Sequence, residues 1–281
     1  MSIIEEAVRK SAEQRRRGQA EPQAGRRPTR RVTAAPAPDA ASARRFRSLA
    51  LDPQTLEHGR IISHLNDEGA RRAYKILRTR VLRRLQTNQW NAFAVTGVSP
   101  GEGKTLTAIN LALALAQDIN TWVFLIDLDL ERPRIAEYLG IGGAGAKGLS
   151  DYLDGRADLE DIAYSPGIVE RLAVIPNFEH MPQSSELLTS PRMLELMQAL
   201  EAETPRRIVI ADMPPILAAD HVLAFAPQVD GVLLVVGEGT TERDALRSAK
   251  EVLAEMNLVG VVLNRASERN EYAYYSYSAA S

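Results

Sequence analysis

Residues 92–116, AFAVTGVSPGEGKTLTAINLALALA, contain the pattern that decides the fold of this chain. The stretch begins with apolar residues that suit a buried strand, continues into a glycine-rich loop, and passes directly into an apolar helical pattern. A strand, a loop and a helix in this order form a phosphate-binding loop, where backbone N–H groups and a helix N-terminus converge on an anion. We expect Lys104 to reach the β- and γ-phosphates and the Thr105 hydroxyl to ligate Mg²⁺.

The loop departs from the usual spacing at one position. The pattern G-x-x-x-x-G-K-[ST] requires glycine at position 98, where this chain has Val98, although Gly97 directly precedes it. Glycine-rich matches also occur in ordinary loops, so this match needs support from elsewhere in the sequence. The residues expected to surround the nucleotide phosphates are Ser99, Pro100, Gly101, Glu102, Gly103, Lys104, Thr105 and Leu106.

Two further apolar runs end in aspartates. Residues 122–130, WVFLIDLDL, carry Asp127 and Asp129, and residues 208–215, IVIADMPP, carry Asp212. Both runs predict buried parallel strands, and ligands bind at the carboxyl ends of such strands. Carboxylates at these ends, near a phosphate loop, predict a shared Mg²⁺. The alternative is that each aspartate only caps a helix or a turn.

Strands and helices alternate along the chain after the phosphate loop. This alternation predicts an α/β fold with a doubly wound, mostly parallel sheet and ligands at the strand C-termini. The predicted strands lie near 92–96, 122–127, 171–175, 207–211, 231–236 and 258–263, and the predicted helices over 103–117, 191–201 and 241–256.

A further helix is predicted over residues 66–86, before the phosphate loop. It has one apolar face and one basic face, and the basic face is either solvated or in contact with another subunit. The basic residues are Arg71, Arg72, Lys75, Arg78, Arg83 and Arg84.

The composition limits the possible functions. The chain has 281 residues, of which 45% are hydrophobic and 25% charged, and its net charge of −2 does not favour a nucleic-acid partner. It has no cysteine, which excludes disulfides and cysteine-based metal sites. The apolar runs are shorter than the roughly 20 residues of a membrane span, and the first residues, MSIIEE, lack the pattern of a signal peptide. We therefore expect a cytoplasmic protein.

The chain divides into three predicted parts. Residues 1–62 form a basic, Pro/Ala-rich arm with too few apolar side chains to offset the entropy of ordering, so we predict disorder. The arm either binds anionic lipid or an acidic partner, or is only solvated. Residues 63–265 form the predicted P-loop domain, and residues 266–281 form a C-terminal tail.

The C-terminal tail concentrates tyrosine. Its sequence from residue 267, SERNEYAYYSYSAAS, has no apolar period that would join it to a core. Mobile tyrosine hydroxyls at a chain terminus are accessible phosphate acceptors, and the alternative is a low-complexity tail without a role. The four tyrosines are Tyr272, Tyr274, Tyr275 and Tyr277.

In combination, these motifs resemble the bacterial tyrosine kinases of capsule and exopolysaccharide loci, a family similar in fold to the MinD/ParA ATPases. The resemblance runs from about residue 66 to the C-terminus. It rests on TGVSPGEGKT, LIDLDLERP, GLSDYLDG at 148–155, SELL at 185–188, IADMPP, DGVLLVV at 230–236, VVLNR at 261–265 and the tyrosine-rich tail.

The resemblance implies an ATP- and Mg²⁺-dependent protein tyrosine autokinase. Lys104 would bind the phosphates and act in catalysis together with Asp127 and Asp129. Asp127 would be the base for the incoming tyrosine hydroxyl, whereas Asp129 and Asp212 would hold Mg²⁺ with Thr105, mainly through water. Positioning and charge neutralisation supply most of the catalysis in such a reaction.

The resemblance also implies further contacts. Asn264 would contact the adenine, and the tail tyrosines would be phosphorylated by a neighbouring subunit of a homo-oligomer. A membrane polysaccharide co-polymerase, or chain-length regulator, would activate the kinase and recruit it to the inner face of the cell membrane. Association with the membrane would then be peripheral, through this partner or the basic arm.

The sequence departs from the family patterns at three places. The pattern D-x-D-x-R has Glu131 in the arginine position, with Arg132 one residue later, and the oligomerisation pattern E-x-x-R-x-x-R becomes Arg72, Lys75 and Arg78. We also expect the family's transmembrane activator segment to come from a separate protein.

Two other functions stay open at this point. A MinD/ParA-like positioning ATPase would usually carry lysine at the start of the loop, where this chain has Ser99. The other alternative is a non-catalytic nucleotide-binding regulator. The sequence names neither the polysaccharide nor the substrates beyond the tail.

Overall fold

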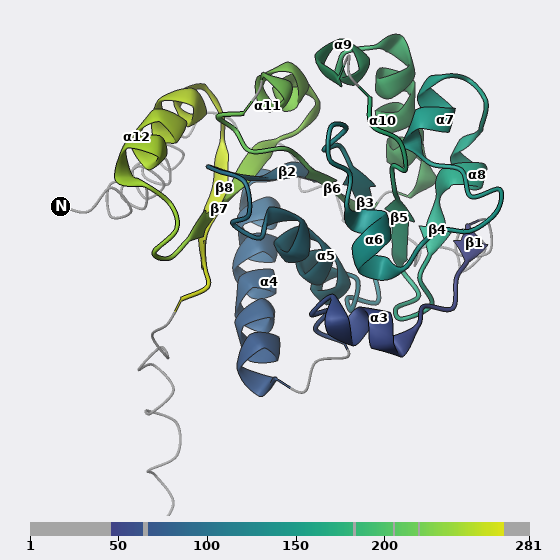
Figure 1. The fold of residues 1–281 in the computed structure, drawn as a ribbon, viewed down its shortest axis with the longest axis horizontal. Helices are drawn as coiled ribbons and strands as arrows, with labels where there is room; N and C mark the ends of the chain where they lie inside the picture. Colours follow the sequence, from purple (N-terminus) through teal and green to yellow (C-terminus); the bar gives the residue numbers. More distant parts are fainter. Residues whose placement is uncertain (1–45, 64–66, 182–183, 205, 219, 267–281) are drawn as a thin grey trace, which may run out of the picture.

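A mostly parallel β-sheet forms the middle layer of the protein (Figure 1). The computed structural model describes residues 46–63, 67–181, 184–204, 206–218 and 220–266, and the described part holds eight strands in the order β1-β4-β5-β3-β6-β2-β7-β8. Every neighbouring pair is parallel except β4 and β5. The strands are β1 (Arg47–Ser48), β2 (Ala92–Gly97), β3 (Trp122–Asp127), β4 (Tyr164–Ser165), β5 (Leu172–Ile175), β6 (Arg207–Asp212), β7 (Gly231–Gly237) and β8 (Leu258–Asn264).

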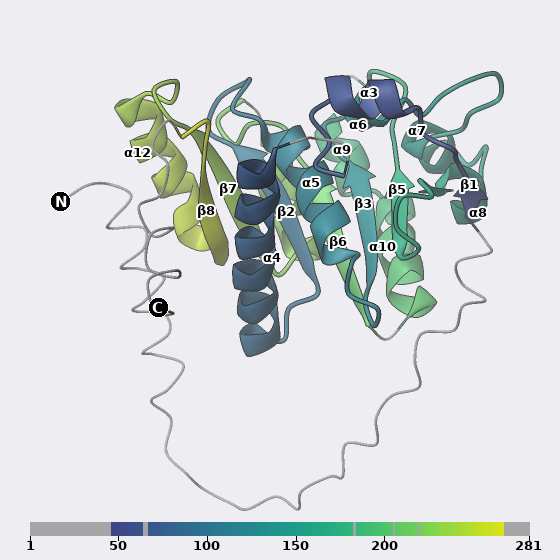
Figure 2. The ribbon, with the colours of Figure 1, turned by 90° about the horizontal axis from the view of Figure 1, so that it is seen from below.

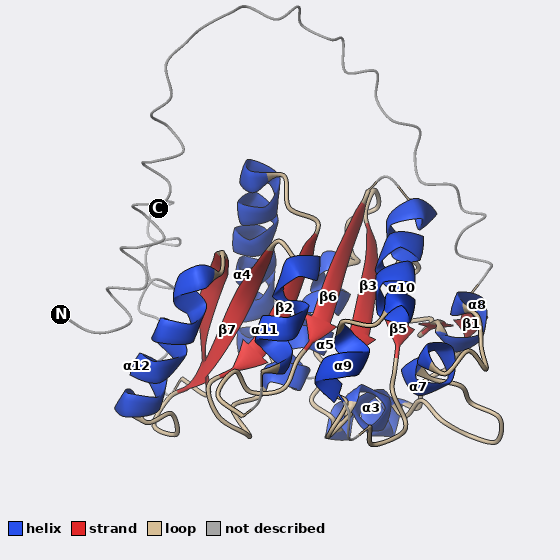
Figure 3. Ribbon diagram, turned by 90° about the horizontal axis from the view of Figure 1, so that it is seen from above, coloured by secondary structure: helices blue, strands red, loops and turns tan. Residues whose placement is uncertain are grey.

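Helices cover both faces of this sheet. In Figure 2, α3 to α6 lie on the near face, and in Figure 3, α9 to α12 lie on the opposite face. The doubly wound α/β fold predicted from the sequence is therefore confirmed. The helices are α3 (Pro53–His58), α4 (Glu68–Asn88), α5 (Lys104–Leu115), α6 (Ile135–Leu139), α7 (Leu149–Leu153), α8 (Leu159–Ile162), α9 (Ser184–Leu188), α10 (Pro191–Glu203), α11 (His221–Phe225) and α12 (Arg243–Val252), with 3₁₀ turns η1 (Ala226–Gln228) and η2 (Leu253–Glu255).

The sheet separates two apolar cores. Successive side chains of a strand point to opposite faces, so each central strand contributes to both cores. In β3, Phe124 belongs to the core beneath α10 and α11, whereas Leu125 belongs to the core beneath α4 and α5. Both side chains are at most 1% exposed, which explains why this strand is a continuous apolar run rather than an alternating one.

The folded part begins earlier than the predicted boundary at residue 62. Phe46 packs edge-on against Trp122, with ring centroids 5.9 Å apart, and Leu56 and Ile61 are at most 1% exposed. The prediction of disorder was therefore wrong for residues 46–62, which contain β1 and α3. It failed because it averaged composition over the whole segment, whereas a few isolated apolar side chains anchor this part to the core. Residues 1–45 lie outside the described residues.

The basic face of α4 is smaller than the sequence suggested. Arg84 is only 8% exposed, donates a hydrogen bond of 3.1 Å to the Leu258 carbonyl, and lies 5.3 Å from the Trp90 ring centroid. Arg78 donates hydrogen bonds to Ala114 on α5 and to Gln117. These two arginines therefore attach α4 to the domain and do not belong to a solvated face. Within the described residues, no helix has the length and hydropathy to cross a membrane.

We predict that Ile61→Ala lowers the free energy of unfolding by about 2–5 kcal/mol, because it leaves a cavity in a fully buried position. Urea denaturation provides the measurement. The matched control is Ile119→Ala, at a position that is 70% exposed and should change the free energy by less than about 0.5 kcal/mol. Equal effects of the two substitutions would show that the segment before α4 is not part of the core.

Candidate functional site

The loop between β2 and α5 has the backbone geometry of a phosphate cradle. Gly101 and Gly103 have φ angles of 81° and 89°, a region that glycine adopts without strain. A Cβ atom on Gly103 would lie 2.2 Å from the Asn264 side-chain nitrogen, so glycine is needed there for close approach as well. α5 begins directly after this residue, at Lys104. Its first N–H groups and its dipole therefore point toward the loop, which suits an anion.

Lys104 connects the loop to the strand ends. Its Nζ atom lies 2.6 Å from Asp129 Oδ2 and 3.4 Å from the Thr105 hydroxyl oxygen. Burial lowers the pKa of Lys104, but the negative charges of Asp212, Asp129 and Asp127 outweigh burial and raise it above its ordinary value. The ammonium group is therefore charged where it contacts Asp129.

Two aspartates lie fully buried at the carboxyl edge of the sheet. Asp127 ends β3 and Asp212 ends β6, and the two residues are direct neighbours in the parallel ladder. Burial, strengthened by the charge of Asp212, raises the pKa of Asp127 well above its usual range. Burial raises the pKa of Asp212 to about 6, although the Lys104 charge opposes this shift.

The unpaired oxygens of these aspartates fit a cation. Among the described residues, no hydrogen bond of normal geometry reaches Oδ1 of Asp127 or either side-chain oxygen of Asp212, although the Thr105 hydroxyl lies close enough to Asp212 to oppose the rise in its pKa. Buried carboxylates without partners are costly, and a bound cation removes that cost. The described residues contain no group of three His, Cys, Asp or Glu side chains that could hold a metal by themselves.

Asp127 and Asp129 also cap local structure. Asp127 Oδ2 accepts the backbone N–H groups of Arg134 and Ile135, both at 2.9 Å, where α6 begins. Asp129 Oδ1 accepts the N–H of Arg132 at 3.1 Å. The capping role that the sequence offered as an alternative therefore exists for both residues, and it leaves one oxygen of each available for the site.

Asn264 lies at the end of β8, where its side chain holds the loop. Its Nδ2 donates to the Glu102 carbonyl at 2.8 Å, and the neighbouring Arg265 donates to the Gly101 carbonyl at 2.7 Å. No pattern in the sequence indicates these contacts, since 162 and 164 positions separate the partners. The adenine contact of Asn264 stays a prediction.

Residues 93–279 match the CobQ/CobB/MinD/ParA nucleotide binding domain. The chain is also 34% identical over 206 residues to the tyrosine-protein kinase YwqD of Bacillus subtilis (strain 168), an alignment that covers 72% of this chain and 84% of YwqD. The chain belongs to the bacterial tyrosine-protein kinases.

Two further tyrosine kinases are similar to this chain. The chain is 32% identical over 217 residues to the tyrosine-protein kinase wzc of Salmonella typhimurium, and the alignment covers 73% of this chain but only 28% of wzc. The kinase domain of Escherichia coli tyrosine kinase ETK is 31% identical, with a TM-score of 0.54, covering 66% of this chain and 72% of that domain.

In this kinase, Glu131, the residue found where the family pattern has arginine, contacts two histidines. The Glu131 carboxylate lies 3.8 Å from His221 Nε2, and its carbonyl oxygen lies 2.9 Å from His180 Nδ1. Neither histidine was singled out from the sequence. The four tail tyrosines of the kinase lie outside the described residues, so their role as acceptors stays a prediction.

We predict that Lys104→Met weakens nucleotide binding about 100-fold, because the carboxylates at the strand ends then repel the phosphates without a compensating cation. Isothermal titration of ATP into the purified kinase gives the affinity, and circular dichroism verifies the fold. Lys147→Met is the matched control, since Lys147 forms a half-exposed ion pair with Asp161. Unchanged ATP affinity in Lys104→Met would remove the lysine from the site.

We predict that Asp212→Asn stabilises the nucleotide-free kinase while impairing its activity. A pKa near 6 lies above the unfolded value, so the ionised carboxylate destabilises the fold at neutral pH. The substitution should therefore raise the melting temperature at pH 7.5. The gain should shrink toward pH 5, where wild-type Asp212 becomes protonated. A variant that is less stable than wild type at pH 7.5 would contradict this account of the buried carboxylate.

Proposed function

We propose that this protein is an ATP-dependent protein tyrosine autokinase that regulates the synthesis or export of an exopolysaccharide or capsule. One observation carries the proposal. The Lys104 ammonium, at the start of the helix behind the phosphate loop, lies against Asp129 at the edge where Asp127 and Asp212 are neighbours in the sheet and carry buried oxygens without a hydrogen bond of normal geometry from the described residues. A charged lysine and buried carboxylates beside an anion cradle suit a phosphoryl transfer with Mg²⁺.

The loop and Lys104 bind and orient the triphosphate. Backbone N–H groups at the start of α5 hold phosphate oxygens. Lys104 leaves its contact with Asp129 and contacts the transferred phosphoryl group instead. Thr105, Asp129 and Asp212 are the residues that would hold Mg²⁺. When bound, this ion neutralises phosphate charge and favours departure of the diphosphate.

Asp127 has the properties of a base for the acceptor hydroxyl. One of its oxygens is fixed by the α6 backbone, while Oδ1 has no hydrogen-bond partner among the described residues. Its raised pKa strengthens its affinity for a proton. The tyrosine oxygen forms the new bond to the γ-phosphorus, the bond from the γ-phosphorus to the bridging oxygen breaks, and the phenolic proton passes to Asp127.

The proposed acceptors are the tail tyrosines of another copy. The tyrosines follow β8 closely in the sequence: Tyr272, Tyr274, Tyr275 and Tyr277. Each phosphate adds about −1.5 to −2 charge, so several on one tail would repel each other and loosen an assembly whose tails occupy neighbouring sites. Phosphorylation would thus drive the homo-oligomer between assembled and dispersed states.

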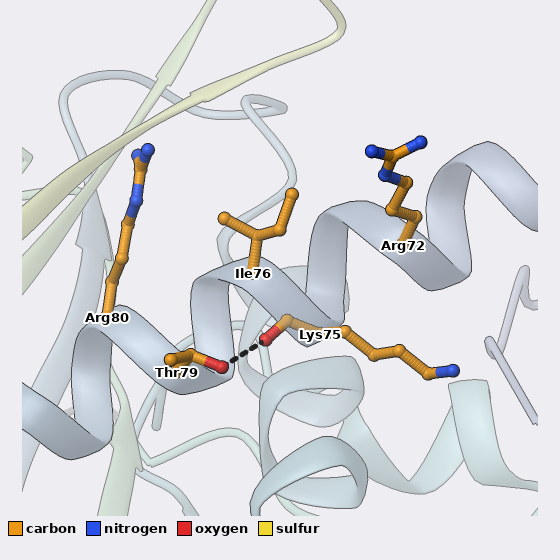
Figure 4. A pocket seen from close by; sticks show the side chains of 5 residues that line it. All are labelled: Arg72, Lys75, Ile76, Thr79 and Arg80. Atoms are coloured by element: carbon orange, nitrogen blue, oxygen red, sulfur yellow. Dashed lines mark hydrogen bonds between the residues drawn. The ribbon is translucent and has the colours of Figure 1, made fainter. Parts of the chain in front are cut away.

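The helix α4 supports the proposed assembly. Arg72, Lys75, Ile76, Thr79 and Arg80 line a shallow pocket on its outer face, shown in Figure 4. Ile76 is 43% exposed, which leaves an apolar side chain among cations. This face suits an acidic, partly apolar surface of a second subunit or of a membrane polysaccharide co-polymerase that recruits and activates the kinase at the inner face of the membrane.

We predict transfer between subunits in a mixture of two variants. One chain carries Lys104→Met with an intact tail, and the other is active but ends after Ser267. With ATP and Mg²⁺, phosphotyrosine should form on the inactive chain at the tail tyrosines, as mapped by mass spectrometry. The control replaces the four tail tyrosines of the inactive chain with phenylalanine.

Two results would change the proposal. Phosphotyrosine in wild type, without any on the inactive chain of the mixture, would restrict the reaction to one subunit. ATP hydrolysis without tail phosphate in either experiment would instead favour a MinD/ParA-like positioning ATPase.

A further inference from the structure

The phosphate loop contains a buried carboxylate that the reaction does not use. Glu102 is 2% exposed, although it lies in a loop that has to attract anions. Its Oε2 accepts the Val98 N–H at 2.6 Å, and its Oε1 accepts the hydroxyl proton of Thr241. Both carboxylate oxygens are thus engaged by donors, which shields their charge from the phosphates.

Thr241 extends this contact to the sheet. Its hydroxyl oxygen accepts the Gly237 N–H at 2.9 Å, at the end of β7. A continuous series of hydrogen bonds therefore connects Gly237, Thr241, Glu102 and Val98, and we call it the loop bridge. It joins the first residue of the loop to the end of β7, across a contact between residues 139 positions apart in the chain.

The loop bridge explains the unusual spacing of the glycines. A Cβ atom on Gly97 would lie 2.6 Å from Glu102 Oε2, so glycine is required at position 97 for the carboxylate to fit. Val98 does not need glycine, since its side chain is buried in the core and its N–H is held by Glu102. Glycine therefore stands one position earlier than in the usual pattern.

We propose that Glu102 and Thr241 are positioning residues that hold the phosphate loop in its nucleotide-binding conformation. The proposal rests on the nucleotide binding in the proposed function and adds that binding depends on β7. Without the loop bridge, Asn264 and Arg265 still hold the carbonyl groups of Glu102 and Gly101, but the start of the loop at Val98 loses its acceptor and populates other conformations. The apparent affinity for nucleotide is then the intrinsic affinity multiplied by the fraction of molecules whose loop is competent to bind.

The test compares four single variants and the Glu102→Ala/Thr241→Val double variant with wild type, using titration calorimetry with ATP and steady-state kinetics of tyrosine phosphorylation. Thr241→Val removes the bridging hydroxyl and Thr241→Ser keeps it. Glu102→Ala removes the carboxylate. Thr240→Val is the matched control, since Thr240 is exposed and its hydroxyl takes no part in the loop bridge. Thr241 lies outside the loop, so its variants report on the loop bridge even if Glu102→Ala folds poorly.

We expect Thr241→Val and Glu102→Ala each to raise the Kd and the KM for ATP about tenfold, as fits a lost hydrogen bond to a charged group. In Thr241→Val, turnover at saturating ATP should stay within about twofold, because bound nucleotide restores the loop. Thr241→Ser should recover most of the affinity. The double variant should bind ATP no more weakly than the single variant with the lower affinity, since each substitution breaks the same series of hydrogen bonds.

Wild-type Kd in Thr241→Val would overturn the loop bridge, as would lower turnover with unchanged KM. An equal loss of ATP affinity in Thr240→Val would also overturn the proposal. The effect would then come from the whole turn after β7 and not from the hydroxyl of Thr241. Wild-type protein that binds no nucleotide at all would instead overturn the proposed function on which the inference rests.

Discussion

The contact between Lys104 and Asp129 is the interaction on which the rest of the site depends. It places a buried ammonium, with its Nζ atom 2.6 Å from a carboxylate oxygen, beside two aspartates that are 0% exposed. Three carboxylates and one lysine leave an excess of negative charge where water is excluded, and such an excess is costly. Lys104 stays charged and compensates part of this excess, and in the proposed reaction the Mg²⁺ ion would compensate more of it.

The fold makes this contact possible by bringing distant segments to one edge. β2 lies between β6 and β7, and β3 adjoins β6, so the loop after β2 and the aspartates after β3 and β6 all emerge at the same edge. The parallel direction of these strands is necessary, because an antiparallel neighbour would send its carboxyl end to the opposite edge. The end of β8 completes the edge, since Asn264 and Arg265 donate to the carbonyl groups of the loop.

The sequence predicted the features that depend on local patterns. The central strands and the helices α4, α5, α10 and α12 appear close to their expected positions, since each is a continuous apolar run or has a helical period. The sequence also pointed to Lys104, Asp129 and Asp212, which the structure brings together at one edge of the sheet.

What the sequence did not predict depends on contacts between distant residues. Phe46 and Ile61 are isolated apolar residues in a polar segment, and only the finished core shows that they are buried. Arg84 looks like a surface charge until the carbonyl of Leu258 and the ring of Trp90 are placed beside it. The partner of Glu102 is likewise a threonine 139 positions away, which no local period reveals.

The most direct test of the central claim is a crystal structure with Mg²⁺ and a non-hydrolysable ATP analogue. The account predicts that Lys104 Nζ leaves Asp129 and contacts the β- and γ-phosphates. It also predicts that Mg²⁺ lies beside Thr105, with Asp129 and Asp212 at its water ligands. A structure in which nucleotide is bound while Lys104 keeps its contact with Asp129, and the oxygens of Asp212 stay without a partner, would contradict it.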